Sequence, residues 1–327
     1  MSANSSSTAA ALALIADDMR AMDTVIERRL TSSVPLVSQV SQYIIAAGGK
    51  RLRPALLMLM SGALGHESEQ RLNMAAVVEF IHTATLLHDD VVDESTLRRG
   101  RATANEVFGN PASVLVGDFL YSRAFQMMVE AGDMRIMQTL AEATNVIAEG
   151  EVLQLMNMHN ASLSEDDYLL VIRSKTAKLF EASARLAALL AKASPAVEQS
   201  CATYGQALGT AFQVIDDVLD YDGDAQVMGK NLGDDLREGK ATLPLIIAMQ
   251  RGNVDERSTI KLAIETGGLE NMASIMSIVE KTDALRATRH VAASEAQRAL
   301  DALDSLPHNR HRQALHQLAS QLLDRRA

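Results

Sequence analysis

The chain has 327 residues, of which 47% are hydrophobic and 22% are charged. Its 41 acidic residues outnumber its 31 Lys and Arg residues, giving a formal net charge of −10 at pH 7. An acidic chain without a basic tract does not suit binding to the phosphate backbone of nucleic acids. The single cysteine, Cys201, excludes an internal disulfide and favours a reducing cytoplasmic location. No apolar run approaches the roughly 20 residues that a transmembrane helix needs, so we expect a soluble protein.

Helix-favouring residues and sparse glycine and proline predict an all-α fold. Short breaks separate long segments with helical spacing of apolar residues, as in a helical bundle. None of the breaks resembles a flexible linker, so we expect one domain over 1–327, with 1–30 as an N-terminal helical extension. In chain order the predicted helices cover 55–64, 72–90, 112–129, 134–158, 168–193 and 197–220.

Two groups of aspartates each follow an apolar helical segment. The first carboxylate group is Asp89, Asp90 and Asp93, in "LLHDDVVDE", and the second carboxylate group is Asp216, Asp217 and Asp220, in "IDDVLDY". On a helix, residues four apart stand about 6 Å apart on one face, so these carboxylates repel each other unless a cation lies between them. One such group alone could equally be a solvated acidic face. Its duplication favours Mg²⁺, which binds one or two carboxylates and completes its shell with water and substrate phosphates.

Calcium is the competing ion, because the segment after Asp220 superficially resembles a calcium-binding loop. An EF-hand loop starting there would need glycine at its sixth position and glutamate at its twelfth. The chain has Ala225 and Asn231 at these positions. The spacing therefore argues against calcium.

The basic turn, "GGKRLRP" over Gly48–Pro54, contains Lys50, Arg51 and Arg53. It lacks the Gly and Ser/Thr positions of a P-loop. We expect Pro54 to be the first residue of a helix, whose free N–H groups and dipole would add to the side chains in binding phosphate. A solvated turn is the alternative interpretation.

Further cations follow the carboxylate groups. Arg98, Arg99 and Arg101 come shortly after the first group, and Lys175, Lys230 and Lys240 stand at isolated positions. Two metal sites accompanied by scattered cations are typical of a pocket for diphosphate, because bound metal reverses the local negative charge.

With these motifs in place, the sequence resembles the trans-polyprenyl diphosphate synthases, and most closely the long-chain bacterial octaprenyl and solanesyl type. The resemblance runs from about Gly48 to Pro244 and rests on motifs in family order. It implies a single-domain isoprenoid-synthase bundle around a deep central cavity, with the two groups on opposing walls. The motifs are "GGKRLRP", "HTATLLHDDVVDESTLRRGRATAN", "SKTAKLF", "AFQVIDDVLDY" and "GKNLGDDLREGKATLPL".

The resemblance also assigns roles to single residues. It implies that both carboxylate groups hold Mg²⁺, three ions in all, around an allylic diphosphate of the farnesyl or geranyl type. The residues matching the allylic diphosphate site are Arg98, Lys175, Thr176, Gln213 and Lys230, with Lys240 as a helper. The residues matching the isopentenyl diphosphate site are Lys50, Arg53, His82 and Arg99. Arg325 and Arg326 at the C-terminus receive no role.

The activity implied is repeated addition of isopentenyl diphosphate to the allylic diphosphate, with Lys175 and Lys230 acting beside the metals. Thr85 and Ala84, four and five residues before Asp89, are small where short-chain relatives have an aromatic floor. A product of C40–C45 for a quinone side chain, such as that of ubiquinone, is therefore predicted. The alternatives are a shorter product of C15–C25, a terpene cyclase and a non-catalytic partner subunit. The resemblance further implies a homodimer, and we also expect a transient membrane contact for product release.

Overall fold

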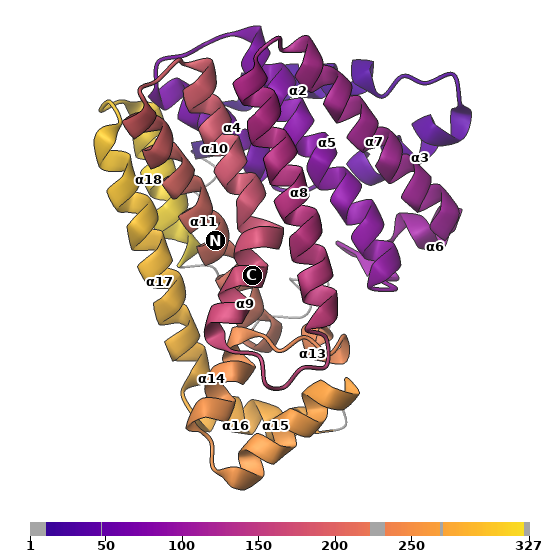
Figure 1. Cartoon of the computed structure of the whole chain (residues 1–327), viewed down its shortest axis with the longest axis vertical. Helices are drawn as coiled ribbons and strands as arrows, with labels where there is room; N and C mark the ends of the chain where they lie inside the picture. The colour runs from indigo at the N-terminus through magenta and orange to yellow at the C-terminus, as the bar shows by residue number, and fades with distance from the viewer. Residues whose placement is uncertain (1–10, 47, 223–232, 269–270, 324–327) are drawn as a thin grey trace. The chain divides into compact units, whose positions relative to one another are not determined.

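The computed structural model describes residues 11–46, 48–222, 233–268 and 271–323 (Figure 1). Most of this part of the chain is helical, which confirms the all-α prediction. The elements are α2 (Ala16–Arg29), α3 (Pro35–Ala46), α4 (Leu52–Ala63), α5 (Glu69–Val92), β1 (Leu97–Arg98), β2 (Arg101–Ala102), α6 (Ala104–Phe108), α7 (Asn110–Glu130), α8 (Met134–Met156), α9 (Glu165–Ile172), η1 (Arg173–Ala177), α10 (Lys178–Leu190), α11 (Pro195–Asp222), α13 (Asp234–Arg237), α14 (Leu243–Arg251), α15 (Val254–Thr266), α16 (Met272–Lys281), α17 (Ala284–Ala302), η2 (Leu303–Ser305) and α18 (Arg310–Leu322).

The predicted helix over 168–193 is interrupted in the structure. α9 passes into a π-helical turn, η1, before the regular α10 begins. A π-turn accommodates an extra residue and occurs frequently at functional sites. Apolar spacing across such a turn stays close to that of an α-helix, which explains why the sequence predicts one unbroken helix.

The chain forms two compact units, each assembled from separate segments. The first unit comprises Met1–Thr144, Leu179–Gly205 and Ala302–Leu318. The second unit comprises Asn145–Lys178, Gln206–Asp301 and Ala319–Ala327. The single domain over 1–327 and the extension over 1–30 remain predictions, and α2 accounts for much of the latter.

The first unit is organised around α5, which packs against α7, α4 and α2 (Figure 1). Side chains of α5 from Met74 to Val78 are fully buried, as are nearly all those of α4. At Gly117 of α7 an added Cβ would collide with the ring of His88, so glycine allows close packing just before the first carboxylate group. The close fit fixes the end of α5 that bears the aspartates.

The second unit has its own apolar core. Buried side chains from α9, the C-terminal part of α11, and α14 to α17 form one cluster, which includes Tyr168, Leu219 and Tyr221. α14, α15 and α16 pack on one another (Figure 1). The carboxylate-bearing end of α11 therefore lies on a well-packed base. No helix within the described residues combines the length and the apolar character needed to cross a membrane.

Candidate active site

The first carboxylate group lies at the C-terminal end of α5. The Asp93 N–H donates to the Asp89 carbonyl at 2.8 Å, so the helical hydrogen bonding continues to Asp93. Asp89 and Asp93 are therefore one turn apart on one face, and both are half-buried. Their spacing matches the arrangement expected from the sequence for a pair of metal ligands.

Asp90 differs from its neighbours because its side chain is completely buried. Both of its oxygens accept hydrogen bonds from Arg98 of β1, with Nη2 at 2.6 Å and Nε at 2.9 Å from Oδ1. The pair ties the β-hairpin to α5. Asp90 thus has a defined partner in the protein, and its predicted metal contact remains a prediction.

The cationic segment after the first group forms a hairpin. β1 and β2 pair antiparallel, with Arg98 opposite Arg101. The two connecting residues, Arg99 and Gly100, have φ values of 53° and 73°. Positive φ at both positions is what a type I′ turn requires. The two adjacent arginines have different neighbours, since Arg98 pairs with Asp90 whereas Arg99 lies against Gly49.

The basic turn precedes α4, but the helix begins earlier than predicted. α4 starts at Leu52, so Pro54 is its third residue and not its first. Proline is tolerated throughout the first turn because the N–H groups there have no helical partner. Arg51 adopts a left-handed conformation with φ 44° and pairs with Asp23 of α2. Arg51 therefore anchors the turn, while Lys50 is exposed.

Arg53 and His82 meet inside the first unit. Arg53 Nη1 lies 3.2 Å from His82 Nε2, and an arginine can only donate in such a contact. The Arg53 guanidinium also stacks over the Phe180 ring, 4.5 Å from its centroid. Burial, with Arg53, Arg99 and Arg98 as further causes, holds the pKa of His82 well below its ordinary value. The imidazole is therefore neutral and presents Nε2 as an acceptor.

Arg99 reaches the basic turn from the hairpin. A Cβ added at Gly49 would lie 2.6 Å from Arg99 Nη1, so only glycine permits this approach. Burial and the neighbouring Arg98 lower the pKa of Arg99. The structure thus gathers Arg53, His82 and Arg99 into one region, as the predicted isopentenyl diphosphate site requires.

Glu79 of α5 was missed by the sequence reasoning. Its Oε1 lies 3.8 Å from Arg51 Nε, and Arg53 and Arg99 also attract its charge. Burial outweighs these arginines and raises the pKa of Glu79. Its Oε2 is buried without a hydrogen-bond partner among the described residues. A lone acid in a largely apolar helical stretch was the signal that could have identified it.

The two residues predicted to set chain length lie on different sides of α5. Thr85 is half-buried and, four residues before Asp89, shares its face. Ala84 is fully buried, as is Phe80, which lies nine residues before Asp89 and therefore on the opposite face. Phe80 does not replace the missing aromatic floor on the Asp89 face.

In the second unit, Asp216, Asp217 and Asp220 all belong to α11, which continues to Asp222. Asp216 is half-buried, whereas Asp217 and Asp220 are buried. Asp217 Oδ2 accepts a hydrogen bond from the Tyr168 hydroxyl at 2.5 Å, and Oδ1 accepts one from Gln213 Nε2 at 2.8 Å. Burial, with Asp235 as the second cause, raises the pKa of Asp217 well above its ordinary value. Asp235 and Asp216 thus crowd Asp217, and a bound cation would relieve the repulsion among these carboxylates.

The π-turn η1 carries the candidate residues Lys175 and Thr176. The Thr176 hydroxyl donates to Gln213 Oε1 at 3.1 Å, so η1 is joined to α11. Lys175 Nζ forms an ion pair with Glu151 Oε2 of α8 at 2.6 Å. A Cβ added at Gly150 would lie 2.8 Å from the Lys175 backbone nitrogen. Gly150 therefore allows α8 to pack directly against η1.

The remaining candidates lie near α13. The Lys240 side chain forms an ion pair with Glu238. The backbone N–H of Lys240 donates to the Asp235 carbonyl at 2.9 Å. Asp235 is an acid that the sequence reasoning overlooked. It raises the pKa of Asp217, which places it near the second carboxylate group. The "GDD" within a lysine-containing motif was the available signal. Lys230, Arg325 and Arg326 lie outside the described residues.

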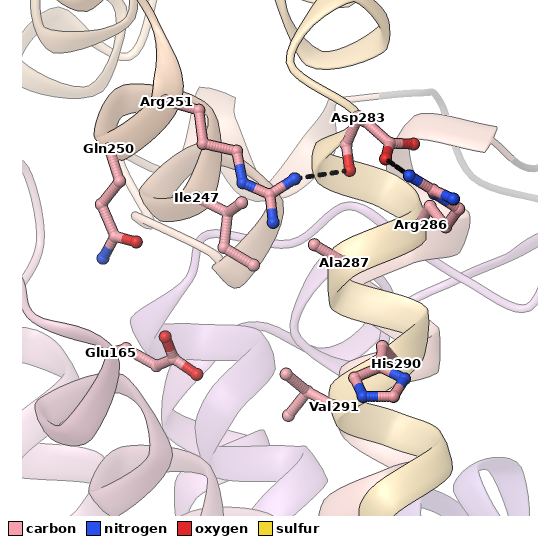
Figure 2. A pocket seen from close by; sticks show the side chains of 9 residues that line it. All are labelled: Glu165, Ile247, Gln250, Arg251, Asp283, Arg286, Ala287, His290 and Val291. Atoms are coloured by element: carbon pink, nitrogen blue, oxygen red, sulfur yellow. Dashed lines mark hydrogen bonds and ion pairs between the residues drawn. The ribbon is translucent and has the colours of Figure 1, made fainter.

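A pocket of about 540 Å³ opens elsewhere in the second unit, between α9, α14 and α17 (Figure 2). Arg251 Nη1 donates to the carbonyls of Thr282 and Asp283, at 3.1 and 3.2 Å. The Asp283 carboxylate is paired with Arg286, as Figure 2 shows. The charges on this side of the pocket are thus engaged in holding helix ends. None of the predicted site residues lines it, so we do not assign it to the reaction.

Comparisons with known proteins identify the family of the chain. The model of the family described as polyprenyl synthetase matches residues 34–282. The chain is 50% identical to octaprenyl diphosphate synthase of Escherichia coli K12, with 94% of the chain and 95% of that protein covered. It is 46% identical to all-trans-nonaprenyl-diphosphate synthase (geranyl-diphosphate specific) of Rhodobacter capsulatus, over 96% of the chain and 97% of that protein.

A solved structure extends the likeness to the whole fold. The polyprenyl synthase of Caulobacter crescentus CB15, complexed with calcium and isoprenyl diphosphate, superposes with a TM-score of 0.94 at 44% identity. The alignment covers 98% of each chain. The family resemblance of the motifs is thereby confirmed, and the chain is a transferase that belongs to the polyprenyl synthetase family.

Proposed function

We propose that this chain is a Mg²⁺-dependent long-chain trans-polyprenyl diphosphate synthase that adds isopentenyl diphosphate units to an allylic diphosphate. One observation carries the proposal: α5 bears a neutral His82 joined to Arg53 and, seven residues later, Asp89 with Asp93 on the same face. Seven residues span about 10 Å of helix. A cationic site for one diphosphate and a carboxylate site for another therefore lie along one rigid element.

The donor set fits Mg²⁺. Asp89 with Asp93, and Asp216 with Asp220, offer hard oxygen ligands at helical spacing, and crowded negative charge around Asp217 favours a cation. Within the described residues, no three acidic, histidine or cysteine side chains form a metal site by themselves. A site completed by diphosphate oxygens needs only one or two carboxylates per ion. We assign three ions to the full site from the family resemblance.

The residues have distinct roles in the proposed reaction. Arg98, Lys175, Thr176 and Gln213 bind and orient the allylic diphosphate, while Lys50, Arg53, His82 and Arg99 bind isopentenyl diphosphate. Bound Mg²⁺ would stabilise the charge on the departing diphosphate. The allylic C–O bond breaks, the isopentenyl double bond forms the new C–C bond, and one proton passes from the added unit to the released diphosphate. Apolar side chains must exclude water, which would otherwise trap the allylic cation as an alcohol.

We assign a product of C40–C45 to the chain. The small Ala84 and half-buried Thr85 leave no aromatic floor next to Asp89, and relatives are named octaprenyl and nonaprenyl synthases. Quinone side chains are the destination that the resemblance suggests. The relatives' names differ in product length, so the exact number of units is part of the test.

We also propose that the chain works as a homodimer and touches a membrane transiently when it releases product. Exposed apolar side chains of the first unit support a partner surface: Leu115 is 67%, Val129 66% and Met134 77% exposed. Light scattering of wild type and Leu115→Glu measures the assembly, and a monomeric wild type would reject the dimer. Product transfer to vesicles measures the membrane step.

The decisive experiment incubates the full chain with Mg²⁺, isopentenyl diphosphate and each of several allylic primers, followed by mass analysis of dephosphorylated products. We expect C40–C45 alcohols, their loss on chelation, and a loss of about a thousandfold or more in Asp89→Ala and Asp216→Ala. Asp255→Ala, at an exposed position of α15, is the matched control. A cyclic hydrocarbon formed without isopentenyl diphosphate, or turnover that survives chelation, would reject the proposal.

A further inference from the structure

Tyr168 is a buried tyrosine that the proposed mechanism does not use. Its side chain is 4% exposed and it belongs to α9, whereas the oxygen that it contacts belongs to α11. The hydroxyl donates to Asp217 Oδ2 at 2.5 Å, and Asp217 itself is only 2% exposed. A short hydrogen bond from a neutral donor to a buried carboxylate is among the stronger hydrogen bonds in proteins.

The contact is one end of a longer chain of hydrogen bonds. Asp217 Oδ1 accepts from Gln213 Nε2 at 2.8 Å, and Gln213 Oε1 accepts from the Thr176 hydroxyl at 3.1 Å. The chain therefore runs from α9 through α11 to the π-turn η1. Both oxygens of Asp217 are held, one by Tyr168 and the other by Gln213, so the carboxylate has a single orientation.

The connected segments are the ones that bear the proposed site. η1 carries Lys175 and Thr176 for the allylic diphosphate, and the last turns of α11 carry Asp216 and Asp220 for the metals. The network fixes how far α11 is rotated relative to η1. Fully satisfied buried networks of this kind specify one arrangement, because a freed member is costly to leave unpaired.

We propose that Tyr168 is a positioning residue for prenyl transfer: by holding the Asp217 carboxylate it keeps the metal-binding turn of α11 in register with the diphosphate-binding turn η1. The inference rests on the proposed function. Tyr168 touches neither substrate nor metal in this scheme and acts only through Asp217. Residues that orient metal-binding groups in this way change metal affinity or activity by about 10- to 100-fold when mutated.

The chain supplies a matched control. Tyr204 is also fully buried, and its hydroxyl donates to the Leu315 carbonyl at 2.7 Å, in the first unit. Tyr168→Phe and Tyr204→Phe thus each remove a hydroxyl group from a buried side chain. Only the first removal frees a carboxylate of the proposed site.

Full-length wild type and both variants are titrated with Mg²⁺ and farnesyl diphosphate by calorimetry, and initial rates are measured across Mg²⁺ concentrations. In Tyr168→Phe we expect about tenfold weaker Mg²⁺-dependent binding and an equal rise in the Mg²⁺ needed for half-maximal rate. The KM for isopentenyl diphosphate stays within about twofold of wild type. Tyr204→Phe lowers Tm but leaves the Mg²⁺ dependence unchanged. Equal Mg²⁺ dependence in all three proteins would overturn the inference.

A second comparison covers the case in which Tyr168→Phe does not fold. Asp217→Asn and the double variant Tyr168→Phe/Asp217→Asn both replace the carboxylate with an amide, and their binding of farnesyl diphosphate should be the same. A further loss in the double variant would show that Tyr168 acts independently of Asp217 and would reject the inference. Absence of Mg²⁺-dependent binding in wild type would reject the proposed function and the inference together, whereas unchanged binding in Tyr168→Phe rejects the inference alone.

Discussion

Arg98 Nη2 lies 2.6 Å from Asp90 Oδ1, and this contact joins a partly exposed guanidinium to a carboxylate that solvent does not reach. The exposed fraction of the side chain is 27% for Arg98 and 0% for Asp90. A second nitrogen of Arg98, Nε, approaches both Asp90 oxygens at 2.9 and 3.2 Å. This forked geometry is specific to arginine, because lysine offers a single charged nitrogen.

Removing Arg98 should therefore destabilise the protein as well as inactivate it. Arg98→Ala leaves the Asp90 carboxylate buried without its partner, and breaking a buried pair in this way costs about 3–5 kcal/mol of unfolding free energy. Arg98→Lys should recover only part of that loss. Denaturant unfolding measures both variants, and Arg98→Ala/Asp90→Ala should be more stable than Arg98→Ala alone.

The control for this pair is the exposed pair of Arg286 and Asp283, in which 83% of the Arg286 side chain is accessible. Arg286→Ala should leave the unfolding free energy close to that of wild type, because solvent screens such pairs. Equal losses for Arg98→Ala and Arg286→Ala would contradict the role of Asp90 burial.

Local pattern accounts for the parts of the fold that could be predicted. Apolar spacing located α5, α7 and α11, and the i, i+4 spacing of Asp89 with Asp93 holds because α5 persists to the end of the motif. The hairpin at Arg99 and Gly100 was not predicted, since strands of two residues have no period to detect. Its x-Gly connection is the one local signal it carries.

Tertiary partners account for the parts that could not be predicted. The sequence marks Asp90 and Asp217 as members of acidic motifs, but nothing in it says that Arg98 and Tyr168 engage them. Asp217 and Tyr168 are 49 residues apart in the chain, and their contact depends on how two helices pack. The hydrogen bonding of Asp217 depends on that packing. The sequence of a single chain does not reveal it.

Stability should depend on His82 as the pH falls. Burial and nearby arginines hold the pKa of His82 well below the value near 6.5 that an unfolded chain has. Below about pH 6.5 the unfolded state binds a proton that the folded state rejects, so the unfolding free energy decreases as pH is lowered. His82→Gln should remove this part of the slope while keeping an acceptor for Arg53.

Urea unfolding between about pH 7.5 and pH 5 measures the slope, which cannot exceed about 1.4 kcal/mol per pH unit for one group. The difference between wild type and His82→Gln isolates His82 from other titrating groups, including Glu79, whose raised pKa acts with the opposite sign. His316→Gln at an exposed position is the control. Parallel slopes for wild type and His82→Gln would count against a neutral His82 in the folded protein.

Product length should respond to Thr85 and Ala84 in different ways. Thr85→Phe places an aromatic ring on the half-buried face that it shares with Asp89, so we expect shorter products. Ala84→Phe should also shorten the product, but because Ala84 is fully buried it should cost about 1–3 kcal/mol of stability. Mass analysis of products from farnesyl diphosphate and thermal unfolding measure the two effects. Thr85→Val is the control of similar size, and unchanged lengths in both phenylalanine variants would remove these residues from the tunnel wall.

Gly150→Ala tests whether α8 positions the π-turn. In an ordinary helix this change is stabilising by up to about 1 kcal/mol, because alanine restricts the unfolded chain. Here the new Cβ would lie 2.8 Å from both the Lys175 nitrogen and Ser174 Cβ, so η1 must move away from α8. We expect a lower unfolding free energy and a higher KM for the allylic diphosphate, since Lys175 would lose its alignment. Ala148→Ser, at an exposed position of α8, should leave both quantities near wild type. A stabilised Gly150→Ala with normal kinetics would mean that close packing of α8 does not fix η1, and that the turn keeps its shape by its own hydrogen bonds.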